Sequence, residues 1–397
     1  MNVCLIIDDY LPDSIKVGAK MMHELAVELV SSGHKVTVVV PEPNLHIPYS
    51  VSSIDGVTVC RFRSGQIKNI PKIKRAINET LLSWQAWRAL QKYFIANPHD
   101  LVVYYSPSIF WGALVMRLKY LWGAKSYLIL RDFFPQWVID SGMLSKWSPI
   151  TGYFKFFEWL SYKAANVIGI QSPKNIDVFK RLHNTSRPLE VLYNWSSNIE
   201  HTGSSGHYRA SLGLTGKVVF FYGGNIGAAQ DMMNIVRLAN RLGDDPRAHF
   251  VLVGSGDEVS LIQQAINSGD AGNMTLLPSV SQLEYERMLS EFDVGLFSLH
   301  AGHSAHNFPG KLLGYMANQK PILGSINLGN DLEQIVCGAN AGFISVNGDD
   351  ELLLANARQL LNSSELRSCM GKSGKLLLND TFSVNAAASL LLKSINR

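Results

Sequence analysis

The sequence predicts an α/β protein built from two Rossmann-like domains. Three observations support this prediction: a length of 397 residues, a regular alternation of short apolar strands with helical segments, and a second run of that alternation after a polar linker. A chain of this length exceeds one ordinary hydrophobic core, so two domains are expected. The 47% hydrophobic content supports packed cores rather than disorder.

The first domain is expected to span residues 1–195. Its strands alternate with helical segments, and such alternation predicts a parallel sheet covered on both faces. The first helix runs at helical apolar spacing from Gly18 to Ser32 and stops at Gly33. The predicted strands are Val3–Ile7, Lys35–Val40, Val57–Phe62, Leu101–Tyr105, Tyr127–Leu130 and Val167–Ile170.

The second domain is expected to span residues 208–380. It follows the segment Tyr193–Tyr208, whose centre is polar and rich in Gly and Ser, as a hinge should be. The predicted strands are Val218–Tyr222, His249–Val253, Thr275–Leu277, Val294–Phe297 and Pro321–Gly324.

The two parts of the chain differ in charge. Residues 1–195 hold 22 Lys+Arg and 14 Asp+Glu, a balance of +8, whereas residues 196–397 have a balance of −4. All eight Trp fall in the first part. Basic charge combined with interfacial aromatic residues is what attraction to an anionic membrane needs.

The termini and cysteines favour a cytosolic protein. No run of eighteen apolar residues occurs, so no transmembrane helix is expected. The start Met1–Asp9 lacks a basic region and a cleavage site, which indicates a buried strand rather than a signal peptide. The four cysteines are far apart without metal-ligand spacing, and we expect them to be reduced: Cys4, Cys60, Cys337 and Cys369.

The stretch His303–Pro321, HSAHNFPGKLLGYMANQKP, carries the strongest functional signal. A polar, His-rich loop turns through Pro309 and Gly310, and Lys311 then begins a short helix. A loop of this kind brings backbone N–H groups, a helix N-terminus and one cation to the same point. That combination binds a diphosphate without a metal.

A glycine-rich turn, Gly223–Gly227, lies earlier in the same half. Its glycines would let a phosphate approach the backbone closely. A tight strand-to-helix turn without a ligand is the alternative, and the spacing fits a dinucleotide-binding fingerprint poorly. A further turn, Val253–Asp257, also ends a strand, and the simple interpretation is a left-handed turn that opens a helix. Together the loop and the first turn predict a nucleotide-diphosphate site.

These stretches resemble the donor-binding region of two-Rossmann (GT-B type) glycosyltransferases, in the retaining family called glycosyl transferases group 1. The chain keeps Tyr315–Ala317 and Lys320-Pro321 of the family's pattern. It departs from the Glu-x7-Glu element, because His306 and Gly314 take the two glutamate places, and Gln319 replaces the usual glycine. The second glutamate commonly holds the ribose, so that role is unassigned.

The resemblance extends over nearly the whole chain and implies a set of site residues. It implies that Leu277 and Pro278 contact uracil, and that a C-terminal helix at residues 384–396 crosses back onto the first domain. We predict Asp132 and Lys311 as catalytic residues; for Asp132 the alternatives are a structural pair with Arg131 or a helix cap. The predicted donor-binding residues are Gly18, Lys16, Gly224, Asn225, Gly227, Leu277, Pro278, His306, Asn307, Phe308, Pro309, Gly310 and Leu312.

No metal or cofactor is expected. His300, His303 and His306 are three apart, but the stretch contains Gly302 and is a loop, so helical ligand spacing does not apply. The chain has no Asp-x-Asp element, which a metal-dependent transferase would use to hold Mg²⁺. Charge neutralisation is therefore assigned to Lys311, helix dipoles and N–H groups.

Two aromatic and basic stretches remain, at residues 68–93 and 146–163. They are either core helices with solvated lysines or surfaces for lipid contact. For residues 147–159 we favour lipid or lipid-carrier contact, because the apolar face is too wide for one groove.

The sequence therefore predicts a metal-independent, retaining glycosyltransferase whose two domains face a cleft. The closest resemblance, to N-acetyl-L-fucosamine transferases, implies a UDP-linked donor and a sugar on undecaprenyl diphosphate as acceptor. It implies O-antigen or capsule synthesis at the inner face of the plasma membrane, with no nucleic-acid partner. The rivals are a nucleotide-sugar 2-epimerase, a nicotinamide-dependent dehydrogenase, and a non-catalytic glycan- or lipid-binding scaffold.

Overall fold

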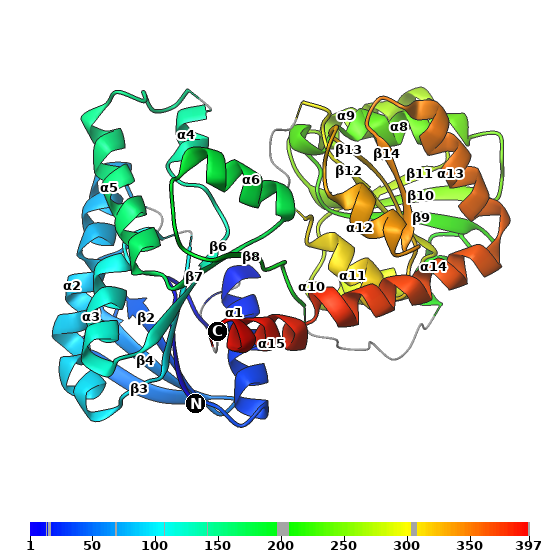
Figure 1. Cartoon of the computed structure of the whole chain (residues 1–397). Helices are drawn as coiled ribbons and strands as arrows, with labels where there is room; N and C mark the ends of the chain where they lie inside the picture. Colours follow the sequence, from blue (N-terminus) through cyan, green and yellow to red (C-terminus); the bar gives the residue numbers. More distant parts are fainter. Residues whose placement is uncertain are drawn as a thin grey trace. The chain divides into compact units, whose positions relative to one another are not determined.

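The computed structural model describes residues 1–12, 14, 17–67, 70–106, 108–140, 142–196, 206–302 and 308–395. The chain divides into two compact units (Figure 1). Unit 1 comprises Met1–Ser196 with Val384–Arg397, and unit 2 comprises Ser197–Ser383. Each unit has its own α/β core, as the repeated strand and helix pattern predicts.

Unit 1 contains an eight-stranded sheet in the order β3-β4-β2-β1-β5-β6-β7-β8. Its strands pair in parallel except β3 with β4, which are antiparallel. Every strand predicted for this part is present, and β3 and β8 are additional; β3 is mostly exposed and so lacks an apolar pattern. The strands are β1 (Asn2–Ile6), β2 (Lys35–Glu42), β3 (Tyr49–Ile54), β4 (Val57–Arg63), β5 (Leu101–Tyr105), β6 (Lys125–Leu130), β7 (Val167–Ile170) and β8 (Leu189–Val191).

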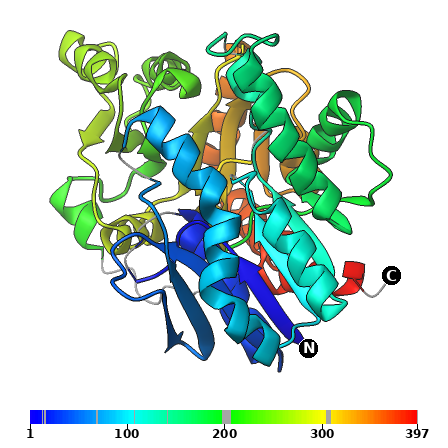
Figure 2. The same ribbon diagram turned by 90° about the vertical axis from the view of Figure 1, so that its left-hand side faces the viewer.

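Helices cover both faces of the unit 1 sheet. On one face α1 (Val17–Ser31) packs against α15 (Val384–Ile395), which returns from the end of the chain and buries Leu391 in the same core. The opposite face carries α2 (Lys72–Ala96), α3 (Gly112–Trp122) and α5 (Pro149–Ala164), which lie side by side in Figure 2. The remaining helices are α4 (Gln136–Asp140) and α6 (Pro173–Leu182).

Unit 2 contains a six-stranded parallel sheet in the order β11-β10-β9-β12-β13-β14. The predicted strands are present, and β14 is additional. Strand order reverses between β9 and β12, and in open α/β sheets ligands bind outside the carboxyl ends of the strands at such a point. The strands are β9 (Val218–Asn225), β10 (Ala248–Ser255), β11 (Met274–Leu277), β12 (Val294–Ser298), β13 (Ile322–Ile326) and β14 (Gly342–Val346).

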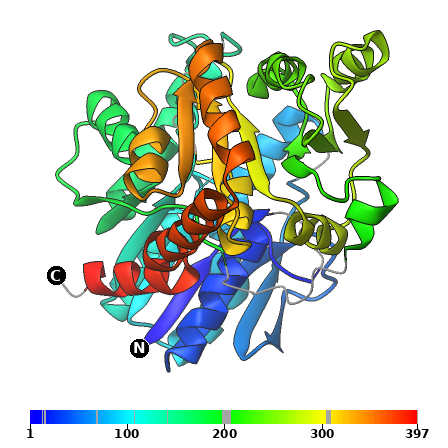
Figure 3. The same cartoon turned by 90° about the vertical axis from the view of Figure 1, so that its right-hand side faces the viewer.

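The helices of unit 2 bury apolar faces against this sheet, and α13 and α14 follow one another along it (Figure 3). Among the described helices of the chain, none is both long and apolar enough to span a lipid bilayer. The helices are α7 (His207–Ser211), η1 (Ala228–Gln230), α8 (Met232–Arg241), α9 (Val259–Ser268), α10 (Gln282–Glu291), α11 (Lys311–Ala317), α12 (Leu332–Gly338), α13 (Asp350–Asn362), α14 (Ser364–Leu377) and η2 (Leu378–Phe382).

Candidate functional site

The structure brings the two predicted phosphate-binding elements of unit 2 together. Lys311 is the first residue of α11, and its Nζ lies 3.5 Å from the centre of the Tyr222 ring. A Cβ placed on Gly224 would stand 3.7 Å from Lys311 Nζ. The ammonium therefore lies over the carboxyl end of β9, beside the exposed backbone at Gly224.

Burial governs the charge of Lys311. Removal of the side chain from water lowers its pKa to about 7. The Tyr222 ring attracts the ammonium through its π face, which acts in the opposite sense. A diphosphate next to Nζ would favour the charged form, so an anion and the proton on Lys311 stabilise each other.

The glycines of the β9 turn are required by close contacts. A Cβ on Gly223 would meet a Tyr285 ring carbon at 2.1 Å, and one on Gly227 would meet Asp257 Oδ1 at 2.5 Å. Gly224 has φ +121°, a conformation that other residues rarely adopt. The backbone of this turn therefore has no room for side chains at Gly223 and Gly227, and its conformation requires glycine at Gly224.

The end of β10 holds the same turn in place. Ile226 N–H donates to Ser255 O at 2.9 Å, and Ala228 N–H donates to Asp257 Oδ1 at 3.3 Å. A Cβ on Gly254 would stand 1.8 Å from Gly224 O. The glycines of Val253–Asp257 therefore serve close packing against the β9 turn.

The amide of Asn225 is part of this framework. Its Nδ2 donates to Gln230 Oε1 at 2.6 Å, next to the short η1 helix. The following helix, α8, begins after Asp231, which has φ +47° and accepts from Asn347 Nδ2 at 2.9 Å. The predicted strand–turn–helix order at Gly223–Gly227 is thus observed.

The described part of the predicted loop supports α11. Phe308 is buried with its ring centre 4.4 Å from that of Phe382, Pro309 is half-buried, and Gly310 is exposed at the start of the helix. Leu312 is fully buried and its N–H donates to Pro309 O at 3.1 Å, so it contributes to the core. His306 and Asn307, like Lys16, lie outside the described residues.

Helix α11 ends in a Schellman motif. Lys320 N–H donates to Tyr315 O at 2.9 Å, and Gln319 N–H donates to Met316 O at 3.1 Å. Gln319 has φ +52°, so the position where the family resemblance expects glycine does adopt the left-handed conformation. The motif directs the chain from α11 into β13.

The predicted uracil-contacting residues lie at the sheet edge. Leu277 ends β11, the edge strand, and is half-buried, whereas Pro278 is exposed. Within the described residues no group of three His, Cys, Asp or Glu side chains is arranged to hold a metal ion. Of the three spaced histidines only His300 is described, and its N–H donates to Ala229 O at 3.0 Å.

In unit 1, Gly18 lies in the first turn of α1, where a Cβ would meet Tyr105 Oη at 3.0 Å. Asp132 follows β6. Desolvation by its neighbours raises the pKa of the carboxyl group although its tip reaches solvent, and the Arg131 guanidinium acts in the opposite sense.

Arg131 and Asp132 attract each other electrostatically, but no hydrogen bond or close ion pair joins them in the part of the chain that is described. Arg131 instead places its guanidinium carbon 5.2 Å from the Trp195 ring centre and its Nη2 3.5 Å from Met21 Sδ. Helix α4 begins only at Gln136, so Asp132 does not cap it. The carboxylate thus stands at the carboxyl edge of the sheet, where functional groups gather.

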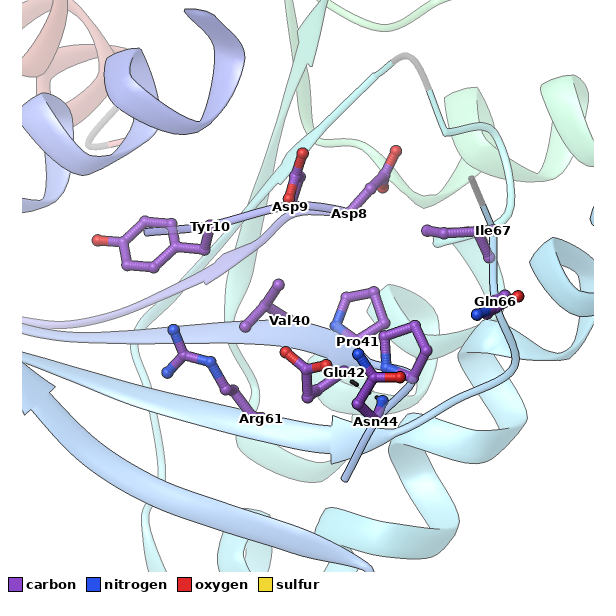
Figure 4. Close-up of a pocket in the computed structure, with 11 residues that line it drawn as sticks. Asp8, Asp9, Tyr10, Val40, Pro41, Glu42, Asn44, Arg61, Gln66 and Ile67 are labelled. Carbon is purple, nitrogen blue, oxygen red and sulfur yellow. Dashed lines mark hydrogen bonds between the residues drawn. The ribbon is translucent and has the colours of Figure 1, made fainter. Parts of the chain in front are cut away.

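Sequence reasoning did not find a pocket of about 230 Å³ in unit 1 (Figure 4). It lies at the carboxyl ends of β1, β2 and β4, next to the point where strand order reverses. Trp111 Nε1 donates to Asp8 Oδ1 at 2.8 Å and so fixes one wall. The pocket is lined by Asp8, Asp9, Tyr10, Val40, Pro41, Glu42, Pro43, Asn44, Arg61, Gln66 and Ile67.

Comparison with known proteins identifies the two units. Residues 206–377 match the family Glycosyl transferases group 1, and residues 18–195 match Glycosyltransferase Family 4. Each of the two units therefore contains a match to one glycosyltransferase domain family. The resemblance seen in the sequence is thereby confirmed at the level of these domain families.

The curated relatives of the chain are distant. It is 24% identical to the glycosyltransferase WbjE of Pseudomonas aeruginosa, over 57% of each chain, and so spans little more than half the length of that relative. It is 22% identical to the colanic acid biosynthesis glycosyl transferase WcaI of Escherichia coli (strain K12), over 78% of this chain and 79% of WcaI.

Solved structures match over the whole chain. WaaG, a glycosyltransferase involved in lipopolysaccharide biosynthesis, matches with a TM-score of 0.64 and 15% identity, over 99% of each chain. HepE of Anabaena, in complex with UDP and glucose, matches with a TM-score of 0.67 and 12% identity, over 100% of this chain and 99% of HepE. At these identities the likeness shows the fold, and it confirms the predicted GT-B fold class.

Proposed function

We propose that this protein is a retaining, metal-independent glycosyltransferase that uses a UDP-sugar as donor. One observation carries the proposal: the ammonium of Lys311 stands over the open backbone at Gly224, at the end of β9. One desolvated cation beside bare backbone suits a diphosphate. Solved relatives in complex with UDP and UDP-glucose support a uridine nucleotide.

In the proposed reaction the bond between the sugar C1 and the β-phosphate oxygen breaks, and a bond from C1 to an acceptor hydroxyl oxygen forms on the same face. The hydroxyl proton passes to the departing phosphate oxygen. Charge builds on the diphosphate, so Lys311 stabilises the transition state more than the ground state. Asp132 would orient the acceptor hydroxyl or support positive charge on the sugar ring.

We assign the donor to unit 2 and the acceptor to unit 1. The predicted donor contacts that unit 2 assembles are Gly224, Asn225, Gly227 and Lys311, and the unit 1 pocket offers carboxylates and amides to sugar hydroxyls. Gly18, in the first turn of α1, belongs to unit 1, and its predicted role toward the donor phosphates stays a prediction.

The acceptor we propose is a sugar on undecaprenyl diphosphate, and the donor sugar to test first is N-acetyl-L-fucosamine. WcaI and WaaG are named for colanic acid and lipopolysaccharide biosynthesis, which supports a role in O-antigen or capsule polysaccharide synthesis. A lipid-linked acceptor would bring the protein to the inner face of the plasma membrane as a peripheral protein. The +8 balance of residues 1–195 supports attraction to anionic lipid.

The test is incubation of the protein with a panel of UDP-, GDP- and ADP-linked sugars and a lipid-diphosphate disaccharide, with release of nucleotide as the readout. We expect UDP release that depends on acceptor, and a product whose anomeric configuration by NMR equals that of the donor. Activity should be unchanged in excess EDTA. Inversion, or activity that EDTA abolishes and Mg²⁺ restores, would contradict the mechanism, and epimerised donor without transfer would contradict the function.

A further inference from the structure

Helix α5 of unit 1 exposes large apolar side chains to solvent and buries polar side chains against the core. Its outward side chains include Ile150, Phe156 and Trp159, which are 56%, 53% and 52% exposed. Its inward side holds Glu158 and Ser161, which are only 3% and 2% exposed. A surface helix of a globular protein normally places its apolar face toward the core, so this reversal needs a cause.

Specific bonds hold the polar side of α5 inward. Glu158 Oε1 accepts from Tyr162 Oη at 3.2 Å and lies 3.5 Å from His183 Nε2. Ser161 O accepts from Tyr104 Oη at 2.6 Å. A Cβ on Gly112 of α3 would stand 2.8 Å from the Leu160–Ser161 backbone, so α3 and α5 are in backbone contact. The helix is therefore fixed in this rotation, and its aromatic side remains in solvent.

The neighbouring helix α2 extends the same apolar surface. Its exposed apolar residues recur every three or four positions and form one stripe. A hydrogen bond between Thr80 Oγ1 and Tyr153 Oη joins α2 to α5, and Figure 2 shows both helices on the same face of unit 1. We define the aromatic face as Ile73, Ile77, Leu81 and Trp84 of α2 with Trp137, Met143, Trp147, Ile150, Tyr153, Phe156 and Trp159 of the α4–α5 region.

Cations accompany three of the four tryptophans of the aromatic face. Lys163 Nζ lies 4.6 Å from the Trp159 ring centre, Lys146 Nζ lies 5.8 Å from Trp147, and the Arg88 guanidinium lies 5.2 Å from Trp84. The carboxylates of the same helices are engaged: Glu79 pairs with Arg75, and Glu158 faces inward. Exposed Asp140 accepts from Gln136. The charge that the face offers to a partner is thus mainly positive.

We propose that the aromatic face docks on an anionic lipid bilayer, with Trp147, Phe156 and Trp159 entering the boundary between headgroups and acyl chains. Tryptophan beside lysine matches that boundary, since the ring meets the apolar layer while the ammonium meets the phosphate. The apolar side chains of α5 spread over about half of its circumference, because each three-residue step turns the helix by about 60°. Such a convex, broad surface fits a deformable bilayer better than a rigid groove.

This proposal deepens the proposed function, since a lipid-linked acceptor requires the enzyme at a membrane, but its test does not depend on catalysis. The full chain is sedimented with vesicles of phosphatidylcholine alone or mixed with phosphatidylglycerol, at low and high salt. We expect binding to the mixed vesicles that falls with salt, because screening shortens electrostatic attraction to about 8 Å at physiological ionic strength.

A triple variant, Trp147→Ser with Phe156→Ser and Trp159→Ser, should bind mixed vesicles at least about tenfold more weakly. Its thermal midpoint should match that of the wild type, because all three side chains are exposed. The matched control is Leu328→Ser in unit 2, which removes a side chain that is 80% exposed and should leave vesicle binding unchanged.

Equal binding to neutral and anionic vesicles, or full binding by the triple variant, would overturn the proposal. So would absence of vesicle binding together with a dimer, seen by light scattering, that the triple variant abolishes; the face would then bind a second copy. Transfer to a water-soluble acceptor analogue reports on the proposed function separately, and the triple variant should retain it. Vesicle binding without any transfer would sink the enzymatic proposal while supporting the docking surface.

Discussion

Units 1 and 2 share one architecture but differ in what they expose to solvent. The described large apolar side chains that unit 2 exposes are Met233, Leu283, Leu328, Leu352 and Leu376, all aliphatic and on separate segments. Unit 1 gathers most of its exposed aromatic side chains on or next to its helices, and a cation lies close to three of these tryptophans, Trp84, Trp147 and Trp159. Single exposed aliphatic residues are normal, whereas a contiguous apolar face marks an interaction surface.

The cations singled out in the two units also differ in their exposure to solvent. Lys311 of unit 2 is largely withdrawn from water and fixed against Tyr222 and Gly224, so its charge acts on one point at short range. Lys146 and Lys163 of unit 1 are exposed, so their charges act diffusely and weaken with salt. The same fold thus supports a single preorganised charge in one unit and a screened, distributed charge in the other.

Among the variants that test this contrast, we expect the largest effect from Lys311→Ala. If the contact of unit 2 with the diphosphate depends on one preorganised cation, turnover should fall by roughly a hundredfold or more, as for loss of one transition-state donor. Steady-state kinetics with saturating acceptor measures the effect. Lys163→Ala of unit 1 is the matched control and should keep its turnover. Near-normal turnover of folded Lys311→Ala protein would show that unit 2 does not depend on a single preorganised cation.

A second test addresses the carboxylate of unit 1. Asp132→Asn should lower kcat by roughly tenfold to a hundredfold with little change in the donor KM, because an orienting or charge-stabilising role strengthens in the transition state. The thermal midpoint should be unchanged, since neither a cap nor a close pair with Arg131 is observed. A lowered midpoint with normal kcat would assign Asp132 to structure.

Much of the fold was predictable because it rests on local pattern. The buried strands of both units are short apolar runs between helical segments, and the periodicity places them without knowledge of their partners. Two of the three strands that were missed lack this signal: β3 is mostly exposed, and β8 has only three half-buried residues. The third, β14, is a largely buried apolar run, so its pattern was overlooked rather than absent. Parallel order then explains why Gly224 and Lys311 meet, since β9 and β12 are neighbours and both elements follow their carboxyl ends.

The surface of unit 1 was only partly predictable. The aromatic and basic composition of residues 147–159 predicted lipid contact, but composition does not fix the rotation of a helix. That rotation depends on long-range contacts, namely the Tyr104 hydroxyl that donates to Ser161 O and the close approach of Gly112 of α3 to the α5 backbone. The unit 1 pocket was missed for a similar reason, because Glu42 and Arg61 come to line one pocket only through the pairing of β2 with β4.

A third test uses the titration of Lys311. Because burial lowers its pKa to about 7, the free enzyme loses the ammonium as pH rises through 7. The donor kcat/KM should therefore fall between pH 6 and pH 8, approaching about tenfold per unit above the pKa. Lys311→Arg keeps its charge over this range and should flatten the profile. A wild-type profile as flat as that of the arginine variant would mean that Lys311 stays charged in the free enzyme, or that the donor does not contact it.

The smallest expected effect concerns the left-handed residues of the two units. Gln319 of unit 2 has φ +52° at the Schellman position of α11, where glycine is favoured because a Cβ crowds the following carbonyl. Gln319→Gly should relieve this strain by more than the added entropy of the unfolded chain, for a net gain of about 0.5–1 kcal/mol in unfolding free energy.

The comparison in unit 1 is Asp55, with φ +48°, whose carboxylate lies 3.0 Å from His23 Nε2. Asp tolerates this conformation better than Gln, and Asp55→Gly also deletes the contact with His23, so that variant should gain nothing or lose stability. Urea unfolding of both variants measures the difference. An equal change in the unfolding free energy of the two variants would show that relief of backbone strain at Gln319 does not stabilise the protein.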